Sequence, residues 1–202
     1  MNQSIAELIA YVGQTMFERN LTDFSGGNVS IRDGDLIHIS PRFAGSKQHW
    51  HLGPEDIVTG EIASDALFEH PRFSREGRTH LAIYRNFPDA QAVIHAHPLY
   101  VLPFCVAEKP IIPVLESGQK FGKIEVIPFS PAHSQELADN IVKALQGKDE
   151  IIRKQAAAVL APKHGIFMAG KDLLATLDAL ERINWNAYCI LAQPIIAQLP
   201  QA

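Results

Sequence analysis

The segment from residue 28 to residue 40 constrains the fold more than any other part of the chain. It reads NVSIRDGDLIHIS, two runs of alternating apolar residues on either side of Asp33-Gly34. An Asp-Gly pair between such runs is typical of a two-residue turn, because glycine readily takes the positive φ that the turn requires. The segment therefore predicts a β-hairpin, and a sheet built on it contains antiparallel strands.

Helical and extended periodicities are mixed along the rest of the chain. Ser4 and Glu7 form a capping-box pattern at the start of an apolar repeat that runs to about Asn20. Further helices are predicted at 75–85, 134–147 and 171–193, and further strands at 90–97, 123–129, 157–161 and 166–169. This mixture indicates a single α+β or α/β domain, residues 1–202, built on a mixed sheet.

Composition favours small-molecule chemistry. The chain has 202 residues, of which 47% are hydrophobic and 20% charged, enough for a sizeable core. With a net charge of −4 and no basic run, we expect neither a nucleic acid nor a membrane surface as partner. The first residues lack the features of a signal peptide, and Cys105 and Cys189 suit reduced core thiols. A cytoplasmic location is expected.

Two histidines, His95 and His97, occupy alternate positions of the strand predicted at 90–97. Because side chains alternate between the faces of a strand, both imidazoles should point the same way. Two imidazoles on one face can bind a divalent transition ion, with other ligands completing its coordination. The alternative is an ordinary pair of partly buried histidines, and the motif by itself leaves both readings open.

Four stretches of sequence together resemble the class II aldolase and adducin family. They are 25–30 (SGGNVS); 39–41 (ISP) with Gly45 and 52–58 (LGPEDIV); 74–76 (SRE) with His80; and 93–98 (VIHAHP) with His164-Gly165. The resemblance covers nearly the whole chain. It implies an α/β/α sandwich, with a central mixed, largely antiparallel sheet flanked by helices.

The same resemblance implies a metal centre. His95, His97 and His164 correspond to the family's metal ligands, and Glu76 to the residue used as fourth ligand or as catalytic base. One divalent ion per chain is expected, Zn²⁺ first and Mn²⁺, Co²⁺ or Fe²⁺ as alternatives. Such an ion stabilises the enediolate formed when a bond beside a carbonyl breaks. Without the histidines, Glu76 would equally be read as an acid that stabilises a helix N-terminus.

Substrate-binding residues follow from the resemblance, with two departures from the family pattern. The expected contacts to substrate or phosphate are Gly27, Asn28, Ser40, Gly45, Ser74 and Arg75. Aldolases carry a Ser-Ser pair where this chain has Ser74-Arg75, and the loop after Ser40 is lengthened by about two residues through Arg42-Phe43-Ala44. Arg42 and Arg75 can bind a phosphate or carboxylate in a bidentate manner, or they can be solvated surface residues.

A third departure concerns proton transfer. In our alignment, the tyrosine that aldolases supply across a subunit interface falls at Phe129, which has no proton to donate. His133 is a titratable candidate for that role, and the alternative is that it merely precedes a helix cap at Ser134. His80, one turn after Glu76, is expected to support the site from behind.

These features favour a metal-dependent lyase of carbohydrate metabolism, one that cleaves a small, phosphorylated, sugar-like ketose by retro-aldol chemistry. The alternatives are an epimerase, a dehydratase or a decarboxylase on the same scaffold, or a non-catalytic binding domain like that of adducin. Three convergent imidazoles argue against the last of these, since a binding scaffold has no need of them. The resemblance also implies a homotetramer with active sites near the subunit interfaces.

Overall fold

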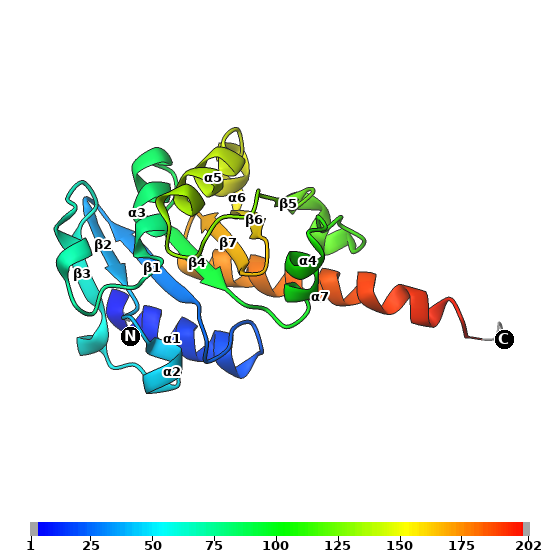
Figure 1. Ribbon diagram of the computed structural model, residues 1–202, viewed down its shortest axis with the longest axis horizontal. Helices are drawn as coiled ribbons and strands as arrows, with labels where there is room; N and C mark the ends of the chain where they lie inside the picture. Colours follow the sequence, from blue (N-terminus) through cyan, green and yellow to red (C-terminus); the bar gives the residue numbers. More distant parts are fainter. Residues whose placement is uncertain (1–3, 200–202) are drawn as a thin grey trace.

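A seven-stranded sheet forms the centre of the computed structural model, which describes residues 4–199 (Figure 1). The strand order is β3-β2-β1-β4-β7-β6-β5, and all neighbouring pairs are antiparallel except β5 and β6. The strands are β1 Asn28–Asp33, β2 Leu36–Ile39, β3 Val58–Glu61, β4 Ala92–Ala96, β5 Glu125–Val126, β6 Ala156–Ala161 and β7 Gly165–Gly170. The predicted mixed, largely antiparallel sheet is confirmed.

The predicted hairpin is β1 and β2. Asp33 pairs with Leu36, and Gly34 has a φ of 58°, as the tight turn requires. On its other edge β1 pairs with β4, in a register that places Asn28 opposite His95. The hairpin therefore brings the glycine-rich segment that precedes β1 next to the histidine strand.

Helices cover both faces of the sheet, as expected for an α/β/α sandwich (Figure 1). The helices are α1 Ile5–Glu18, α2 Ala44–Gln48, α3 Gly77–Asn86, α4 Leu102–Ala107, α5 Gln135–Leu145, α6 Asp149–Lys154 and α7 Leu173–Ile196. Ile94 of β4 packs in one core with α1 and α7, whereas Val93 packs in the other core with α3 and α5. Alternation along β4 thus divides the apolar residues between two layers.

Several predicted boundaries need correction. The strand predicted at 123–129 is only two residues long, β5, because Pro128 lacks the N–H that would extend the ladder. Helix α7 continues past the predicted end at Gln193, through Pro194 to Ile196. Glu76 is the residue just before α3 and does not lie in its first turn. Strand β3 and the short helices α2, α4 and α6 were not predicted.

Between residues 4 and 199, no helix combines the length and the apolar character needed to cross a bilayer.

Candidate metal centre and substrate cavity

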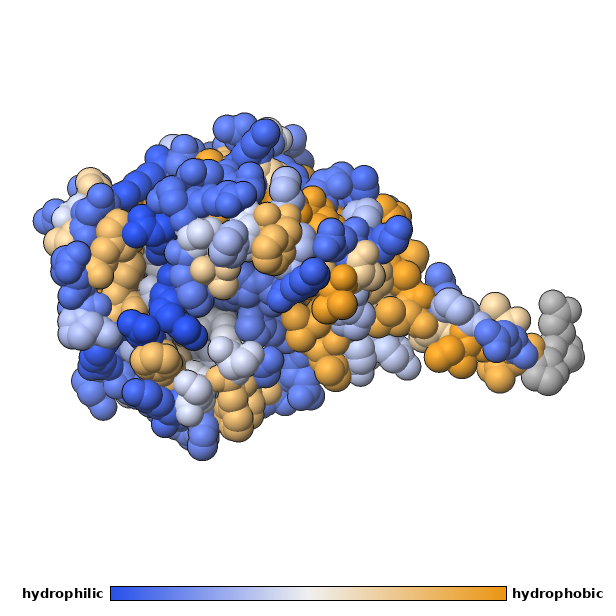
Figure 2. Space-filling model, viewed as in Figure 1, coloured by the Kyte–Doolittle hydropathy of each residue, from blue (hydrophilic) through white to orange (hydrophobic). Residues whose placement is uncertain are grey.

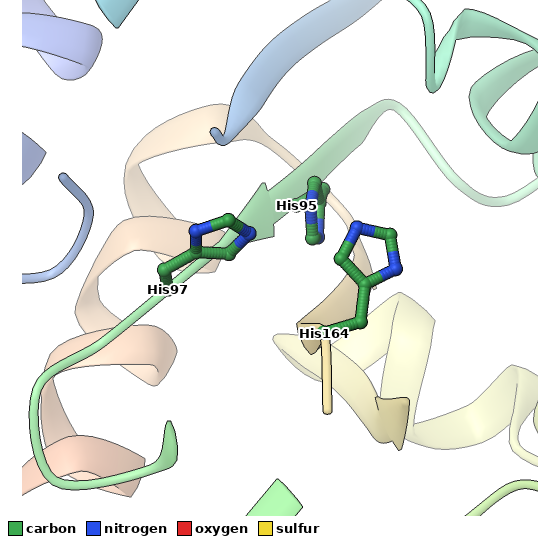
Figure 3. Close-up of side chains that lie close together, drawn as sticks. All are labelled: His95, His97 and His164. Atoms are coloured by element: carbon green, nitrogen blue, oxygen red, sulfur yellow. The ribbon is translucent and has the colours of Figure 1, made fainter. Parts of the chain in front are cut away.

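Three histidines meet at the ends of the central strands. His95 lies in β4, His97 follows the end of β4 by one residue, and His164 lies in the turn between β6 and β7. Their candidate ligand atoms all lie within 4.8 Å of one another. Figure 3 shows the three rings turned toward a common space. Since β4 pairs with β7, the sheet itself brings the histidine strand beside the turn that carries His164.

His95 is held as a neutral imidazole. Its Nδ1 lies 3.1 Å from the carbonyl oxygen of Ile166, which can only accept, so Nδ1 carries the proton and Nε2 keeps its lone pair. The ring stacks on Phe167, with 4.1 Å between centroids. Burial, followed by the neighbouring His164 and His97, lowers the pKa of His95 well below its usual value. A neutral imidazole is the form that binds a metal ion.

His97 and His164 complete the set in different ways. His97 turns Nδ1 toward Asp23 Oδ1 and Ser25 Oγ, each 3.3 Å away, and its Nε2 is buried without a hydrogen-bond partner in the described chain. Burial lowers the pKa of His164, although Glu76 acts in the opposite direction. The unpartnered Nε2 of His97 and the neutral state favoured at His95 and His164 fit a divalent transition ion.

Glu76 is a buried carboxylate beside the histidines. Its Oε1 lies 2.8 Å from His133 Nδ1, 3.1 Å from the His133 backbone nitrogen and 3.4 Å from His164 Nε2. Burial acts to raise the pKa of Glu76, but the hydrogen bond from His133 and the charges of His164 and His133 outweigh it, and the pKa lies below its usual value. The carboxylate is held ionised next to the three histidines, paired with His133.

His133 therefore does more than precede the cap at Ser134. Its backbone is in the left-handed region, with a φ of 67°, a conformation that costs free energy in a non-glycine residue. That conformation directs both the backbone N–H and the ring at the same oxygen of Glu76. Phe129, in contrast, is exposed and does not line the cavity.

A cavity of about 220 Å³ opens over the three histidines. Of the residues predicted to bind substrate, five line it: Gly27, Asn28, Gly45, Ser74 and Arg75. Glu76, His133, Arg42 and Phe43 also line it. Ser40 does not, because it is fully buried and its Oγ accepts a hydrogen bond from the Val29 N–H. Gly26 must lack a side chain, since a Cβ there would lie 2.3 Å from the His97 ring.

Positive charges gather around Phe43 at the wall of this cavity. Arg42 Cζ, Lys47 Nζ and Arg75 Cζ lie 4.8, 4.5 and 5.5 Å from the centroid of its ring. Within residues 4–199, none of these cations has a carboxylate oxygen within 4.0 Å. Cations held together without an acidic partner repel one another, and an anion placed between them would relieve the repulsion. The cluster favours an anionic group on the substrate.

Sequence reasoning missed two supports of the site. Trp50 is fully buried, and its indole N–H donates to the carbonyl oxygen of Asp23 at 3.0 Å. Asp23 in turn accepts hydrogen bonds from Ser25 and Gly26 and faces His97. An Asp two residues before a serine, followed by glycines, is a pattern typical of a side-chain-stabilised turn, and that signal was available.

His80 lies behind the site in a buried polar cluster. Its Nδ1 is 2.7 Å from Ser30 Oγ, which is itself 2.8 Å from the Tyr84 hydroxyl. Burial lowers the pKa of His80 to about 3, against the opposite effect of Glu76. In the unfolded chain, His80 has its ordinary pKa of about 6.5. At pH values between about 3 and about 6.5, His80 therefore binds a proton in the unfolded chain but not in the folded chain.

Stability of the metal-free protein should therefore fall as the pH drops from about 6.5 toward 3, by up to about 1.4 kcal/mol per pH unit for this one group. His80→Asn should flatten that dependence, because its amide can bond to Ser30 but does not titrate. Urea unfolding at several pH values measures the slope. Equal slopes for the variant and the parent would show that His80 does not contribute.

The protein family is defined by the comparisons. A family model, the Class II Aldolase and Adducin N-terminal domain, matches residues 7–191, and the chain belongs to this family. The chain is 33% identical over 159 residues to L-fuculose phosphate aldolase of Methanococcus maripaludis, and the match covers 78% of this chain and 80% of that protein. It is 28% identical over 191 residues to 3-oxo-tetronate 4-phosphate decarboxylase of Haemophilus influenzae, covering 90% and 84%.

Solved structures agree on the fold. The crystal structure of L-fuculose-1-phosphate aldolase from Thermus thermophilus superposes with a TM-score of 0.81 at 22% identity, covering 98% of both chains. A second L-fuculose 1-phosphate aldolase structure gives a TM-score of 0.79 at 24% identity, covering 100% of this chain and 92% of the other. The sandwich with its largely antiparallel sheet is thus the class II aldolase fold.

Proposed function

We propose that this protein is a metal-dependent lyase that cleaves a carbon–carbon bond of a small, phosphorylated, sugar-like ketose by retro-aldol chemistry. One observation carries the proposal: three convergent imidazoles and a buried, ionised carboxylate share one cavity of about 220 Å³. Relatives named as L-fuculose phosphate aldolases support the reaction class. A purely binding role, as in adducin, has no use for this donor set.

His95, His97 and His164 would hold the ion, and Zn²⁺ suits three neutral imidazoles best. Mn²⁺, Co²⁺ or Fe²⁺ remain alternatives. When bound, the ion supplies Lewis-acid stabilisation of the negative charge that develops on substrate oxygens. The groups assigned below belong to the same chain, which we propose forms a single domain over residues 1–202.

Proton transfer falls to Glu76 and His133. Retro-aldol cleavage requires a base that takes the hydroxyl proton at the breaking bond and an acid that protonates the carbon left behind. Glu76 is ionised and lines the cavity, so we assign it the first role. His133 is half-exposed and bonded to the same carboxylate, so it can exchange a proton between Glu76 and solvent, or deliver one in place of the missing tyrosine.

The phosphate would lie between the glycine loop and the cation cluster. Gly27, Asn28, Gly45 and Ser74 offer uncharged donors on the cavity wall, and Arg75 adds a guanidinium. Arg42 and Lys47 reinforce that charge through their positions around Phe43. We therefore propose that the lengthened loop after Ser40, through Arg42-Phe43-Ala44, strengthens binding of the phosphate.

A decarboxylase is the second candidate. It is favoured by the relative named 3-oxo-tetronate 4-phosphate decarboxylase, whose match extends over 90% of this chain. Both reactions break a bond beside a carbonyl and leave an anion that the same metal ion would stabilise. Decarboxylation has no hydroxyl proton to remove, so it would need only an acid that protonates the carbon left behind. An epimerase or a dehydratase would differ only in which bond changes.

The test is a screen of zinc-loaded protein against ketose phosphates, their unphosphorylated counterparts and 3-oxo sugar acid phosphates. Release of an aldehyde and a three-carbon ketone phosphate identifies the aldolase, and release of CO₂ identifies the decarboxylase. We expect turnover only for phosphorylated compounds. Equal rates with the unphosphorylated sugars would overturn the assignment of the cation cluster to phosphate.

We also propose a homotetramer in the cytoplasm. Apolar side chains gather over α4 and the projecting part of α7 (Figure 2). Trp185, Tyr188 and Leu191 are exposed large side chains of α7. Tyr100 extends this patch, with its ring 4.9 Å from Tyr188. Patches of this kind mark association surfaces. The free thiols of Cys105 and Cys189 are consistent with a reducing compartment.

A double variant, Trp185→Glu with Tyr188→Glu, should lower the particle mass measured by light scattering, because two charges would be buried in the interface. Leu174→Glu, an exposed apolar residue at the other end of α7, is the control and should keep the parental mass. A parent that is monomeric at every concentration would contradict the proposal.

A further inference from the structure

His97 needs support that the sheet does not supply. β4 ends at Ala96, so the backbone of His97 lies outside the ladder that holds His95. His95 is also oriented by the carbonyl oxygen of Ile166 in the neighbouring strand. The ring of His97 has no such main-chain partner in the described chain. Its Nδ1 faces only side chains, those of Asp23 and Ser25.

One oxygen of Asp23 gathers four polar groups. Oδ1 accepts from the Ser25 N–H at 2.8 Å, the Ser25 hydroxyl at 2.7 Å and the Gly26 N–H at 3.2 Å, and it lies 3.3 Å from His97 Nδ1. A carboxylate only accepts, so His97 Nδ1 must carry the proton. The lone pair then lies on Nε2, the buried atom that has no other partner.

Asp23 is itself anchored from the core. The buried indole of Trp50 donates to the Asp23 carbonyl oxygen at 3.0 Å. The Trp50 ring packs closely against Gly13 and Gly27. A Cβ atom added to Gly13 would lie 2.7 Å from the ring, and one added to Gly27 would lie 3.3 Å from it. The hydroxyl of Thr22 bonds to the Gly26 carbonyl oxygen at 3.0 Å and ties down the same turn. The carboxylate therefore sits on a rigid support.

We propose that Asp23 is a positioning residue with two linked effects: it orients and polarises His97 toward a metal ion, and it holds the glycine loop that lines the substrate cavity. Because one oxygen serves both, metal binding and the shape of the loop are coupled. Carboxylate partners of ligating histidines raise ligand basicity and fix the tautomer. In the described chain, only His97 of the three histidines faces a carboxylate through Nδ1, since Nδ1 of His95 faces a main-chain carbonyl and Nδ1 of His164 has no hydrogen-bond partner.

The competing explanation is that Asp23 merely stabilises a turn. Asp23→Asn separates the two, because an amide oxygen still accepts from the Ser25 and Gly26 N–H groups but carries no charge. Asp23→Ala removes both effects. The matched control is Asp56→Asn, since Asp56 also accepts a loop N–H, from Gly53 at 2.9 Å, and does not line the cavity.

The experiment measures Zn²⁺ affinity by competition with a chromophoric chelator. We expect affinity to fall about 10-fold in Asp23→Asn and about 100-fold in Asp23→Ala, with no change in Asp56→Asn. Parental affinity in Asp23→Asn would show that the residue only stabilises the turn. The melting temperature of each metal-free variant is recorded alongside, and a fall in affinity that merely tracks that temperature would also overturn the proposal.

This inference rests on the metal centre of the proposed function, so a second measurement separates the two. ¹⁵N NMR of the metal-free protein reports which nitrogen of His97 carries its proton. We expect Nδ1–H in the parent and a mixture of tautomers in Asp23→Ala. If the parent binds no zinc, the proposed function fails while the pairing is still tested. If the tautomer is unchanged in Asp23→Ala, the pairing itself fails.

Discussion

Glu76→Gln is expected to lower turnover by at least about 100-fold while the metal stays bound, the usual scale for loss of a general acid or base. The carboxylate is almost fully buried, bonds to His133 and lies 3.4 Å from His164 Nε2. Glutamine keeps its size but cannot take a proton. Three imidazoles with a water molecule already satisfy a tetrahedral ion, so zinc content should not change. Steady-state kinetics on a screened substrate, together with metal analysis, measure both quantities.

The control for this prediction is Glu61→Gln, an exposed acid on β3 outside the cavity, which should match the parent. His133→Gln adds information, since it leaves Glu76 in place and removes the titratable neighbour. Turnover of Glu76→Gln at the parental rate would show that the carboxylate does not move the proton. His133 would then become the better candidate for the base.

His97→Ala is expected to weaken zinc binding more than 100-fold, beyond the roughly 10- to 100-fold effect of changing an outer partner. The imidazole supplies one of three converging ligand atoms, and two imidazoles leave an incomplete set. Metal content after dialysis against a chelator measures the loss. The fold should survive, because the side chain lies at the cavity and not in either apolar core.

The matched control is His51→Ala, an exposed histidine of the lengthened loop. Circular dichroism distinguishes loss of the metal from loss of structure. A double variant, His95→Ala with His97→Ala, should bind essentially no zinc. Full occupancy in that protein would refute the three-histidine centre.

Much of the fold follows from local patterns. The alternating runs around Asp33-Gly34 predicted the hairpin, and the capping box at Ser4 correctly predicted the start of the first helix. Both succeed because period and cap chemistry are properties of a few neighbouring residues. The length of β5 was overestimated because it depends on more than local sequence. Its apolar residues suit a strand, but the partner strand β6 and Pro128 limit how far the pairing can extend.

For the candidate site, the period of two in the strand placed His95 and His97 on one face, and family resemblance added Glu76 and His164. The sequence could not show that His133 would bond to Glu76 through a left-handed backbone. Nor could it show that three cations would surround Phe43, or that Ser40 would turn away from the cavity to hold Val29. Apart from Arg42 and Lys47, which are near neighbours of Phe43 in the chain, these contacts join residues from separate segments.

The sequence by itself thus determined the longer helices, most of the strands, the hairpin and the chemistry of the ligand pair, because each depends on residues within a few positions of one another. Only the tertiary structure decided which distant groups meet. The pairing of β4 with β1 and β7 brings residues near 25, 95 and 164 to the same end of the central strands, and the packing of Trp50 sets Asp23 beside His97. Such convergence depends on strand register and core packing, which local propensity does not specify.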